Sequence, residues 1–148
     1  TGSNTVAFGH NVGSLPNGHI YPSPLADTMS PVQGMDKNGS TAVIKSASKL
    51  PMHRFALGGP LNIRLSPQLI ATERDVDNIM SFLRAIEEAG VYHVQFNIIS
   101  SEALKKAMQE PDKYRDLMVR VASFTAFFVD LTPEQQLDII RRTEHQGL

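Results

Sequence analysis

Residues 120–131 read RVASFTAFFVDL, a run that is apolar enough to be buried, yet it begins with Arg120 and places Ser123 beside Phe124. A hydroxyl in such a run needs a hydrogen-bond partner or a packing role, because burying an unpaired polar group costs free energy. Taken alone, the residues favour a packing role, in which a small side chain lets two segments approach closely. Ser123 has no G-x-S-x-G motif and no identifiable His and Asp partners, so the run does not indicate a hydrolase triad.

The composition describes a chain of the size of one ordinary domain. It has 148 residues, of which 41% are hydrophobic and 20% are charged, enough to bury an apolar core. The 14 Lys and Arg balance the 15 Asp and Glu without a basic cluster, which argues against nucleic-acid binding. No stretch approaches roughly 18 unbroken apolar residues, and the first residues lack the layout of a signal peptide. We therefore expect a cytoplasmic protein with neither a nucleic-acid nor a membrane partner.

The residue types also limit the chemistry. Cysteine is absent, so this chain supplies no disulfide, thiolate ligand or cysteine nucleophile. Gly58 and Gly59 match neither a dinucleotide-binding motif nor a Walker loop. The histidines show no pair at metal-ligand spacing and no H-E-x-x-H motif, so we expect no metal site. They stand at positions 10, 19, 53, 93 and 145.

The chain divides by composition at about residue 57. Residues 1–57 are rich in glycine and proline, which predicts wrapping loops, with one short helix at residues 41–50 that ends at Pro51. Residues 58–148 alternate strand-like and helix-like segments, which is typical of the α/β class. We expect the first region to wrap around a larger body.

The first strand and helix are predicted by periodicity. Residues 61–65 and 93–99 alternate apolar and polar side chains, as half-buried strands do. Residues 72–89 predict an amphipathic helix that is capped by Thr72 and stopped by Gly90. Its expected inward face consists of Val76, Ile79, Met80, Leu83 and Ile86.

Two further helices follow. Ser100 is placed to cap a short helix that Pro111 closes, and Thr132 begins a capping box with Pro133 at the first helical position. We expect this last helix to run to about residue 145, with its inward face formed by Leu137, Ile139 and Ile140.

Three blocks of sequence together resemble the C-terminal portion of glycyl radical enzymes, the family of pyruvate formate-lyase, glycerol and diol dehydratases and arylacetate decarboxylases. The blocks are residues 16–51 (PNGHIYPSPLADTMSPVQGMDKNGSTAVIKSASKLP), residues 92–131 (YHVQFNIISSEALKKAMQEPDKYRDLMVRVASFTAFFVDL) and residues 132–145 (TPEQQLDIIRRTEH). They cover nearly the whole chain in the family's order and spacing. An unrelated α/β domain is the remaining interpretation.

The resemblance implies the C-terminal part of a ten-stranded α/β barrel built around a buried site. In the family one loop carries a cysteine that forms a thiyl radical, and a second loop near the C-terminus carries the glycine that stores the radical. This chain would supply the second loop, which lies in residues 58–148, the glycyl-radical-like region, and is buried within the barrel. The cysteine loop would lie upstream or on another polypeptide.

The resemblance places Ser123 at the position of the radical glycine, with Arg120, Val121 and Phe124 keeping the flanking pattern R-V-x-G-[Y/F]. A glycine Cα radical delocalises over both neighbouring peptides, and glycine has no side chain to oppose the planar geometry. A serine replaces one of the two α-hydrogens, so we expect a radical-deficient loop. His19 is a second departure, since the family usually has Arg after the glycine of residues 16–19, and Arg brings a permanently charged fork.

Two interpretations of function follow from the resemblance. In the first, the chain is the C-terminal segment or a small subunit of a radical lyase, dehydratase or decarboxylase. It would need a larger partner that carries the cysteine loop, and the assembly would be an oligomer. No bound cofactor is expected, and a radical S-adenosylmethionine activase would be the family's means of installing the radical. In the second, the chain is a non-catalytic docking or regulatory module derived from the radical domain.

Overall fold

The structure is a computed structural model that describes residues 4–16, 18–55 and 58–148. Asn17, which belongs to the stretch at residues 16–19 where the family usually has Arg, lies outside the described residues. Residues 56 and 57, beside the expected division of the chain, lie outside them too. That division stays a prediction.

A parallel sheet lies at the centre of the molecule. Its strands are β1 (Leu61–Leu65), β2 (Val94–Ile98) and β5 (Glu144–His145), in the order β2-β1-β5. The register pairs Asn62 with Gln95 and Arg64 with Asn97, which puts polar side chains side by side on neighbouring strands. The chain is therefore α/β, as its alternating segments predict.

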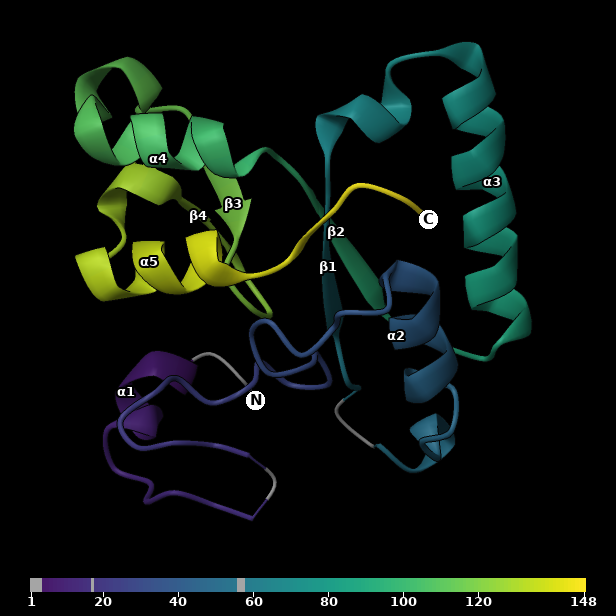
Figure 1. Cartoon of the computed structure of the whole chain (residues 1–148), viewed down its shortest axis with the longest axis horizontal. Helices are drawn as coiled ribbons and strands as arrows, with labels where there is room; N and C mark the ends of the chain where they lie inside the picture. The colour runs from purple at the N-terminus through teal and green to yellow at the C-terminus, as the bar shows by residue number, and fades with distance from the viewer. Residues whose placement is uncertain (1–3, 17, 56–57) are drawn as a thin grey trace.

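Helices cover both sides of this sheet, as Figure 1 shows, with α2 and α3 on one side and α4 and α5 on the other. Short 3₁₀ turns η1 to η4 occur between them. The bounds are α1 (Thr5–Gly9), α2 (Ser40–Ala47), η1 (Met52–Arg54), η2 (Pro67–Ile70), α3 (Glu73–Glu88), α4 (Ser101–Gln109), η3 (Pro111–Tyr114), η4 (Phe128–Asp130) and α5 (Pro133–Arg141).

The predicted helix caps are confirmed. Thr72 and Thr132 each form a capping box. The threonine hydroxyl accepts from the backbone N–H three residues on, and the side chain at that position accepts from the threonine N–H. The Ser100 hydroxyl accepts from the Ala103 N–H at the start of α4. After α3 the chain turns at Gly90, whose φ of +69° suits glycine better than residues with a Cβ.

The inward face of α3 differs from the prediction. Phe82 and Ile86 are its buried residues, whereas Val76 and Met80 are 52% and 46% exposed. Leu83 is exposed too, and Ile79 is half-buried. The periodicity identifies residues that share a helix face, but only part of that face contacts the sheet and α2.

The C-terminal helix is shorter than predicted. It ends at Arg141, and Glu144 and His145 form strand β5 beside β1 instead of a last helical turn. Ile139 is buried as expected, but Leu137 is 40% exposed. The buried guanidinium of Arg64 binds the carbonyl groups of Ile139 and Ile140 at the end of α5, so a tertiary contact satisfies the helix terminus there.

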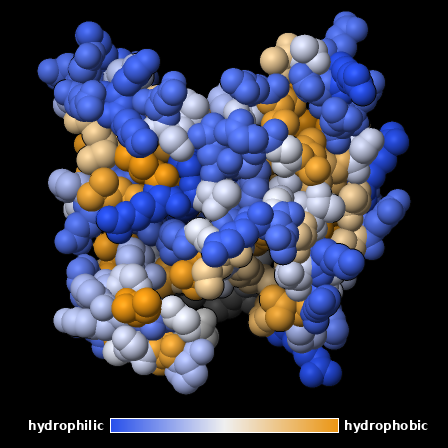
Figure 2. Space-filling model, viewed as in Figure 1, coloured by the Kyte–Doolittle hydropathy of each residue, from blue (hydrophilic) through white to orange (hydrophobic). Residues whose placement is uncertain are grey.

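Two apolar cores flank the sheet, and between them the molecular surface is hollowed, as Figure 2 shows at the upper edge. One core joins α2 and α3 to β1. The other joins α4 and α5 to a β-hairpin formed by β3 (Met118–Arg120) and β4 (Thr125–Phe127). The hairpin is thus anchored to the second core through its own buried side chains.

Candidate functional site

The hairpin of β3 and β4 carries Ser123 at its tip. The loop that joins the strands is closed by a hydrogen bond from the Val121 N–H to the Phe124 carbonyl at 3.0 Å. Val121 and Ala122 are buried at 6% and 2% exposure, whereas Ser123 is exposed and Phe124 is 39% exposed. Within the described residues the Ser123 hydroxyl makes no hydrogen bond. Val121 is therefore the last residue before the tip that belongs to the second core, and the chain turns outward after Ala122.

The run at residues 120–131 is thus partly buried, and the expected burial of its tip within a complete barrel stays a prediction. Residues on the core side of the hairpin are buried, but no described segment covers Ser123 or Phe124. Within the described residues Ser123 packs against no other segment, and its packing role stays a prediction for contact with another polypeptide. An apolar run in sequence does not show which of its residues turn outward at a hairpin.

Arg120, which precedes the loop, is held by side chains of the sheet and hairpin. Its Nε donates to the Gln95 Oε1 at 2.5 Å, and its Nη1 donates to the Thr125 Oγ1 at 2.8 Å. Thr125 stands opposite Arg120 in the hairpin register. The guanidinium therefore bridges β2 and β4 at the base of the loop.

Two asparagines from neighbouring parallel strands reach the backbone of the loop. The Asn97 Oδ1 accepts from the Arg120 N–H at 2.8 Å, and its Nδ2 donates to the Arg120 carbonyl at 2.9 Å. The Asn62 Nδ2 donates to the Ala122 carbonyl at 3.1 Å. The backbone is thus bound at residues 120 and 122, directly before the exposed residue at the tip.

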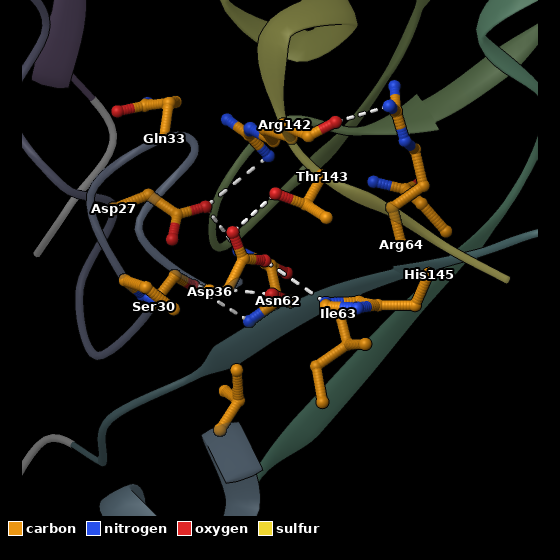
Figure 3. Close-up of a pocket in the computed structure, with 13 residues that line it drawn as sticks. Asp27, Ser30, Gln33, Asp36, Asn62, Ile63, Arg64, Arg142, Thr143 and His145 are labelled. Atoms are coloured by element: carbon orange, nitrogen blue, oxygen red, sulfur yellow. Dashed lines mark hydrogen bonds and ion pairs between the residues drawn. The ribbon is translucent and has the colours of Figure 1, made fainter. Parts of the chain in front are cut away.

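Buried charges lie beneath Asn62. Its Nδ2 also donates to the Asp27 Oδ2 at 2.7 Å, and the same carboxylate oxygen lies 3.3 Å from the Arg142 Nη1. The Arg142 Nη2 contacts the Asp138 Oδ2 at 3.1 Å, and Gln33 donates to the other oxygen of Asp138 at 2.6 Å. These contacts connect the loops of the first region to Asp138 in α5 and to Arg142, which follows that helix. Figure 3 shows the part of the group that joins Asp27 to Asn62 and Arg142.

Burial sets the ionisation of this group. Desolvation raises the pKa of Asp27 above its usual value, and the Arg142 charge opposes that shift without cancelling it. The Asp27 Oδ1 and the Asn62 Oδ1 are buried without a hydrogen-bond partner among the described residues. A cavity of about 30 Å³ lies between Asp27, Asn62, Arg64 and Arg142. It is large enough for a water molecule, and its lining is polar enough to bind one.

A second pair of buried groups fixes the C-terminal strand. The His145 Nε2 lies 3.0 Å from the Asp36 Oδ2, and the Thr143 hydroxyl donates to the other oxygen. Burial opposes ionisation of Asp36, but the hydrogen bonds from His145 and Thr143 outweigh it and lower the pKa of Asp36. The Glu144 carboxylate accepts from the Ser101 N–H at 2.7 Å, at the N-terminus of α4.

His19 lies apart from the loop. It is 3% exposed, its Nδ1 is 3.2 Å from the Ser23 hydroxyl, and its Nε2 is 3.4 Å from the Val12 carbonyl. In this structure His19 fixes the fold of the first loops.

Sequence reasoning identified Ser123, Arg120, Val121 and Phe124, and the structure gathers them in one hairpin. It missed the polar groups beneath the loop, Asp27, Asn62, Asn97 and Arg142. One signal was present, since both strands of the pair β1 and β2 carry amide or charged side chains at alternate positions. In a parallel sheet, which is usually apolar on both faces, such a polar row indicates a polar contact.

Other sites receive no support from the described residues. They contain no group of three or more His, Asp or Glu side chains that could hold a metal ion. None of their helices is long and apolar enough to cross a membrane.

Comparison with known proteins identifies the family. A family model described as glycine radical matches residues 25–129, a range that includes the hairpin and most of the polar groups beneath it. The chain belongs to the glycyl radical family, and the resemblance found in its sequence is confirmed.

The relatives include lyases and dehydratases. The chain is 44% identical over 144 residues to the probable dehydratase YbiW of Escherichia coli (strain K12). The alignment covers 97% of this chain and 18% of that protein. It is 39% identical over 145 residues to an isethionate sulfite-lyase of Oleidesulfovibrio alaskensis, with the same two coverages. The glycerol-bound form of the B12-independent glycerol dehydratase from Clostridium butyricum superimposes with a TM-score of 0.91 at 39% identity, over 96% of this chain and 18% of that one.

Proposed function

We propose that this chain is the C-terminal part, or a separate small subunit, of a glycyl-radical-type enzyme and acts with a polypeptide that carries the cysteine loop. The chain spans 18% of the curated relatives that it matches, and it contains no cysteine. Its sheet is open at β2, so strands from elsewhere are needed to complete a barrel. The assembled protein would be a cytoplasmic oligomer.

The observation that carries the proposal is the geometry of residue 123. A hairpin tip that projects from a fixed base is suited to meet a second loop at a shared site. Ser123 occupies this tip, and the segment that precedes it is fixed at Arg120 and Ala122 by hydrogen bonds to β2 and β1. The names of the relatives, which include a sulfite-lyase, a probable dehydratase and an indoleacetate decarboxylase, support an assembly that acts as a lyase, dehydratase or decarboxylase.

Ser123 does not fit a stored glycyl radical. A radical at Cα is most stable when the two neighbouring peptides share a plane, and a Cβ substituent crowds that arrangement. A serine also has one α-hydrogen where glycine has two. We therefore propose that the chain does not store the radical, and we assign no chemical step to the Ser123 hydroxyl.

Electron paramagnetic resonance tests this directly. The assembled protein is treated under anaerobic conditions with a radical S-adenosylmethionine activase, in the unsubstituted form and as Ser123→Gly. We expect a Cα-radical doublet in Ser123→Gly alone, with Ser123→Ala as a matched silent control. A doublet assigned to residue 123 in the unsubstituted chain would contradict the radical deficiency. No doublet in Ser123→Gly would contradict the assignment of residue 123 to the radical position.

A second candidate function is a non-catalytic docking module. The outer face of the hairpin supports it, because Met118 and Phe127 are paired in register and are 62% and 43% exposed. An exposed apolar pair beside an open strand edge suits contact with another protein. Recovery of the chain from its native source only as an isolated monomer would contradict both functions. A stable complex that turns over no substrate, even as Ser123→Gly, would favour docking.

A further inference from the structure

The side-chain amide of Asn62 is oriented by two acceptors that differ in kind. One hydrogen of its Nδ2 points to the buried carboxylate of Asp27, at 2.7 Å, and the other to the carbonyl of Ala122, at 3.1 Å. Its Oδ1 is buried and has no partner among the described residues. A flipped amide would place that oxygen against two acceptors. The pair of acceptors therefore permits one orientation of this side chain.

The Ala122 carbonyl is the last anchored backbone group before the tip. Asn97 binds both backbone groups of Arg120, and Asn62 binds residue 122. The bond from Val121 to Phe124 closes the turn across residue 123, but it is internal to the loop and moves with it. Only the Asn62 contact ties the peptide between residues 122 and 123 to the sheet within the described residues.

We infer that Asn62 is a positioning residue for the loop tip, and that Asp27 holds Asn62 in its working orientation. The amide fixes the peptide that precedes residue 123 and so sets where the Cα of residue 123 lies above the sheet. The importance of that Cα rests on the proposed function, whereas the positioning itself does not. The contact also couples the loop to residue 27, which lies far from it in the sequence.

Ser30 provides a matched control. Its hydroxyl accepts from the Asn62 backbone N–H at 3.0 Å and therefore touches the same residue from the other side. Ser30→Ala removes a contact of the Asn62 backbone and one hydrogen bond of the Asp27 carboxylate, but it leaves the Asn62 side-chain amide and both of its acceptors in place. A general loosening of β1 would follow from either substitution, whereas a loss of positioning follows from a change at the amide alone.

The test uses hydrogen exchange measured by mass spectrometry on the peptide that contains residues 118–127, in the assembled protein. Asn62→Ala is expected to accelerate exchange in the loop by about five- to tenfold, the size expected for the loss of one hydrogen bond. Asn62→Asp keeps the side-chain shape but replaces the donor with an acceptor, and it should accelerate exchange at least as much. Ser30→Ala should change the loop by less than about twofold.

A spin label gives a second readout that overall stability does not set. This chain contains no cysteine, so Ser123→Cys accepts one nitroxide at the tip when the chain is labelled before it is combined with any partner. Its spectrum should show faster motion in the Asn62→Ala background and unchanged motion with Ser30→Ala. The inference is overturned if the loop exchange and the label motion are unaffected in both Asn62 variants, or if Ser30→Ala alters them equally. Neither readout requires a radical at residue 123, so a failure here is distinct from a failure of the proposed function.

Discussion

The base and the tip of the β3–β4 hairpin are separated by a few residues and have opposite environments. At the base, Val119 and Ala122 are buried and the backbone of Arg120 is bound by Asn97. At the tip, Ser123 is exposed and its hydroxyl has no partner within the described residues. The difference shows that the contacts of the hairpin fix the position of its base, whereas its tip stays available for contact with another segment.

The largest expected effect is a loss of stability when the buried base of the hairpin is disrupted. Phe128 is fully buried in the second core, so Phe128→Ala should lower the free energy of unfolding by about 3–5 kcal/mol. Phe124, four residues earlier, is 39% exposed, so Phe124→Ala should cost less than about 1 kcal/mol. Denaturant unfolding measures both. Similar losses for the two variants would show that the tip is packed after all.

The next effect concerns the charges beneath the loop. Arg142→Met keeps much of the side-chain volume but leaves the buried carboxylates of Asp27 and Asp138 without their cation, which should cost about 3 kcal/mol. Arg115→Met breaks an exposed pair with Asp112 and should cost less than about 1 kcal/mol. Denaturant unfolding of both variants at neutral pH checks the ratio. Equal losses would contradict a buried role for Arg142.

Acidification should change the contributions of Asp36 and Asp27 to stability in opposite directions. The pKa of Asp36 is lowered by folding, so its stabilising contribution is present above its unfolded pKa of about 3.9 and is lost as the pH falls through its folded pKa. The pKa of Asp27 is raised by burial, so the cost of its charge disappears as the pH falls through its folded pKa toward about 3.9.

Two variants test these opposite signs. In Asp36→Asn, the free energy of unfolding should fall less on acidification below about pH 4, because protonation of Asp36 no longer removes a stabilising charge. In Asp27→Asn, the free energy of unfolding should fall more steeply on acidification above about pH 4, because protonation of Asp27 no longer relieves the cost of a buried charge. The measurement is the free energy of unfolding at a series of pH values in constant salt. A change of the same sign in both variants would contradict the assignment of the two shifts.

The smallest effect is expected at the tip. Ser123 has no positive φ, so it fits the loop without strain, and Ser123→Gly should cost only about 0.5–1 kcal/mol through the freedom of the unfolded chain. The melting temperature should fall slightly. A loss several times larger would show that the serine side chain makes a structural contact, and Ser123→Ala would then show a similar loss.

Local signals predicted much of the fold. Strand β1 has the bounds that alternation predicts, and the caps at Thr72, Ser100 and Thr132 begin helices where expected, because a cap is formed within a few residues of sequence. The exposure of Val76 and Met80 was not predictable in this way. Periodicity shows that residues share a face, and the neighbouring segment decides whether that face is covered.

The site was predictable only in its local part. The motif at residues 120–124 marks the hairpin, but the floor beneath it joins segments far apart in the chain, as in the contact of Gln33 with Asp138. The end of α5 was missed for a related reason. Arg64 binds carbonyl groups at that helix end and allows the chain to turn into β5, and no local pattern announces a contact across 75 residues.

The exposure of the tip over a buried base can be measured by thiol labelling. Because the chain has no cysteine, Ser123→Cys and Ala122→Cys each introduce a single reactive group at adjacent positions. Ala122 is 2% exposed and Ser123 is exposed, so Ser123→Cys should react with a neutral thiol reagent at least about a hundredfold faster under native conditions. Equal protection of the two positions in the isolated chain would contradict an exposed tip held over a buried base.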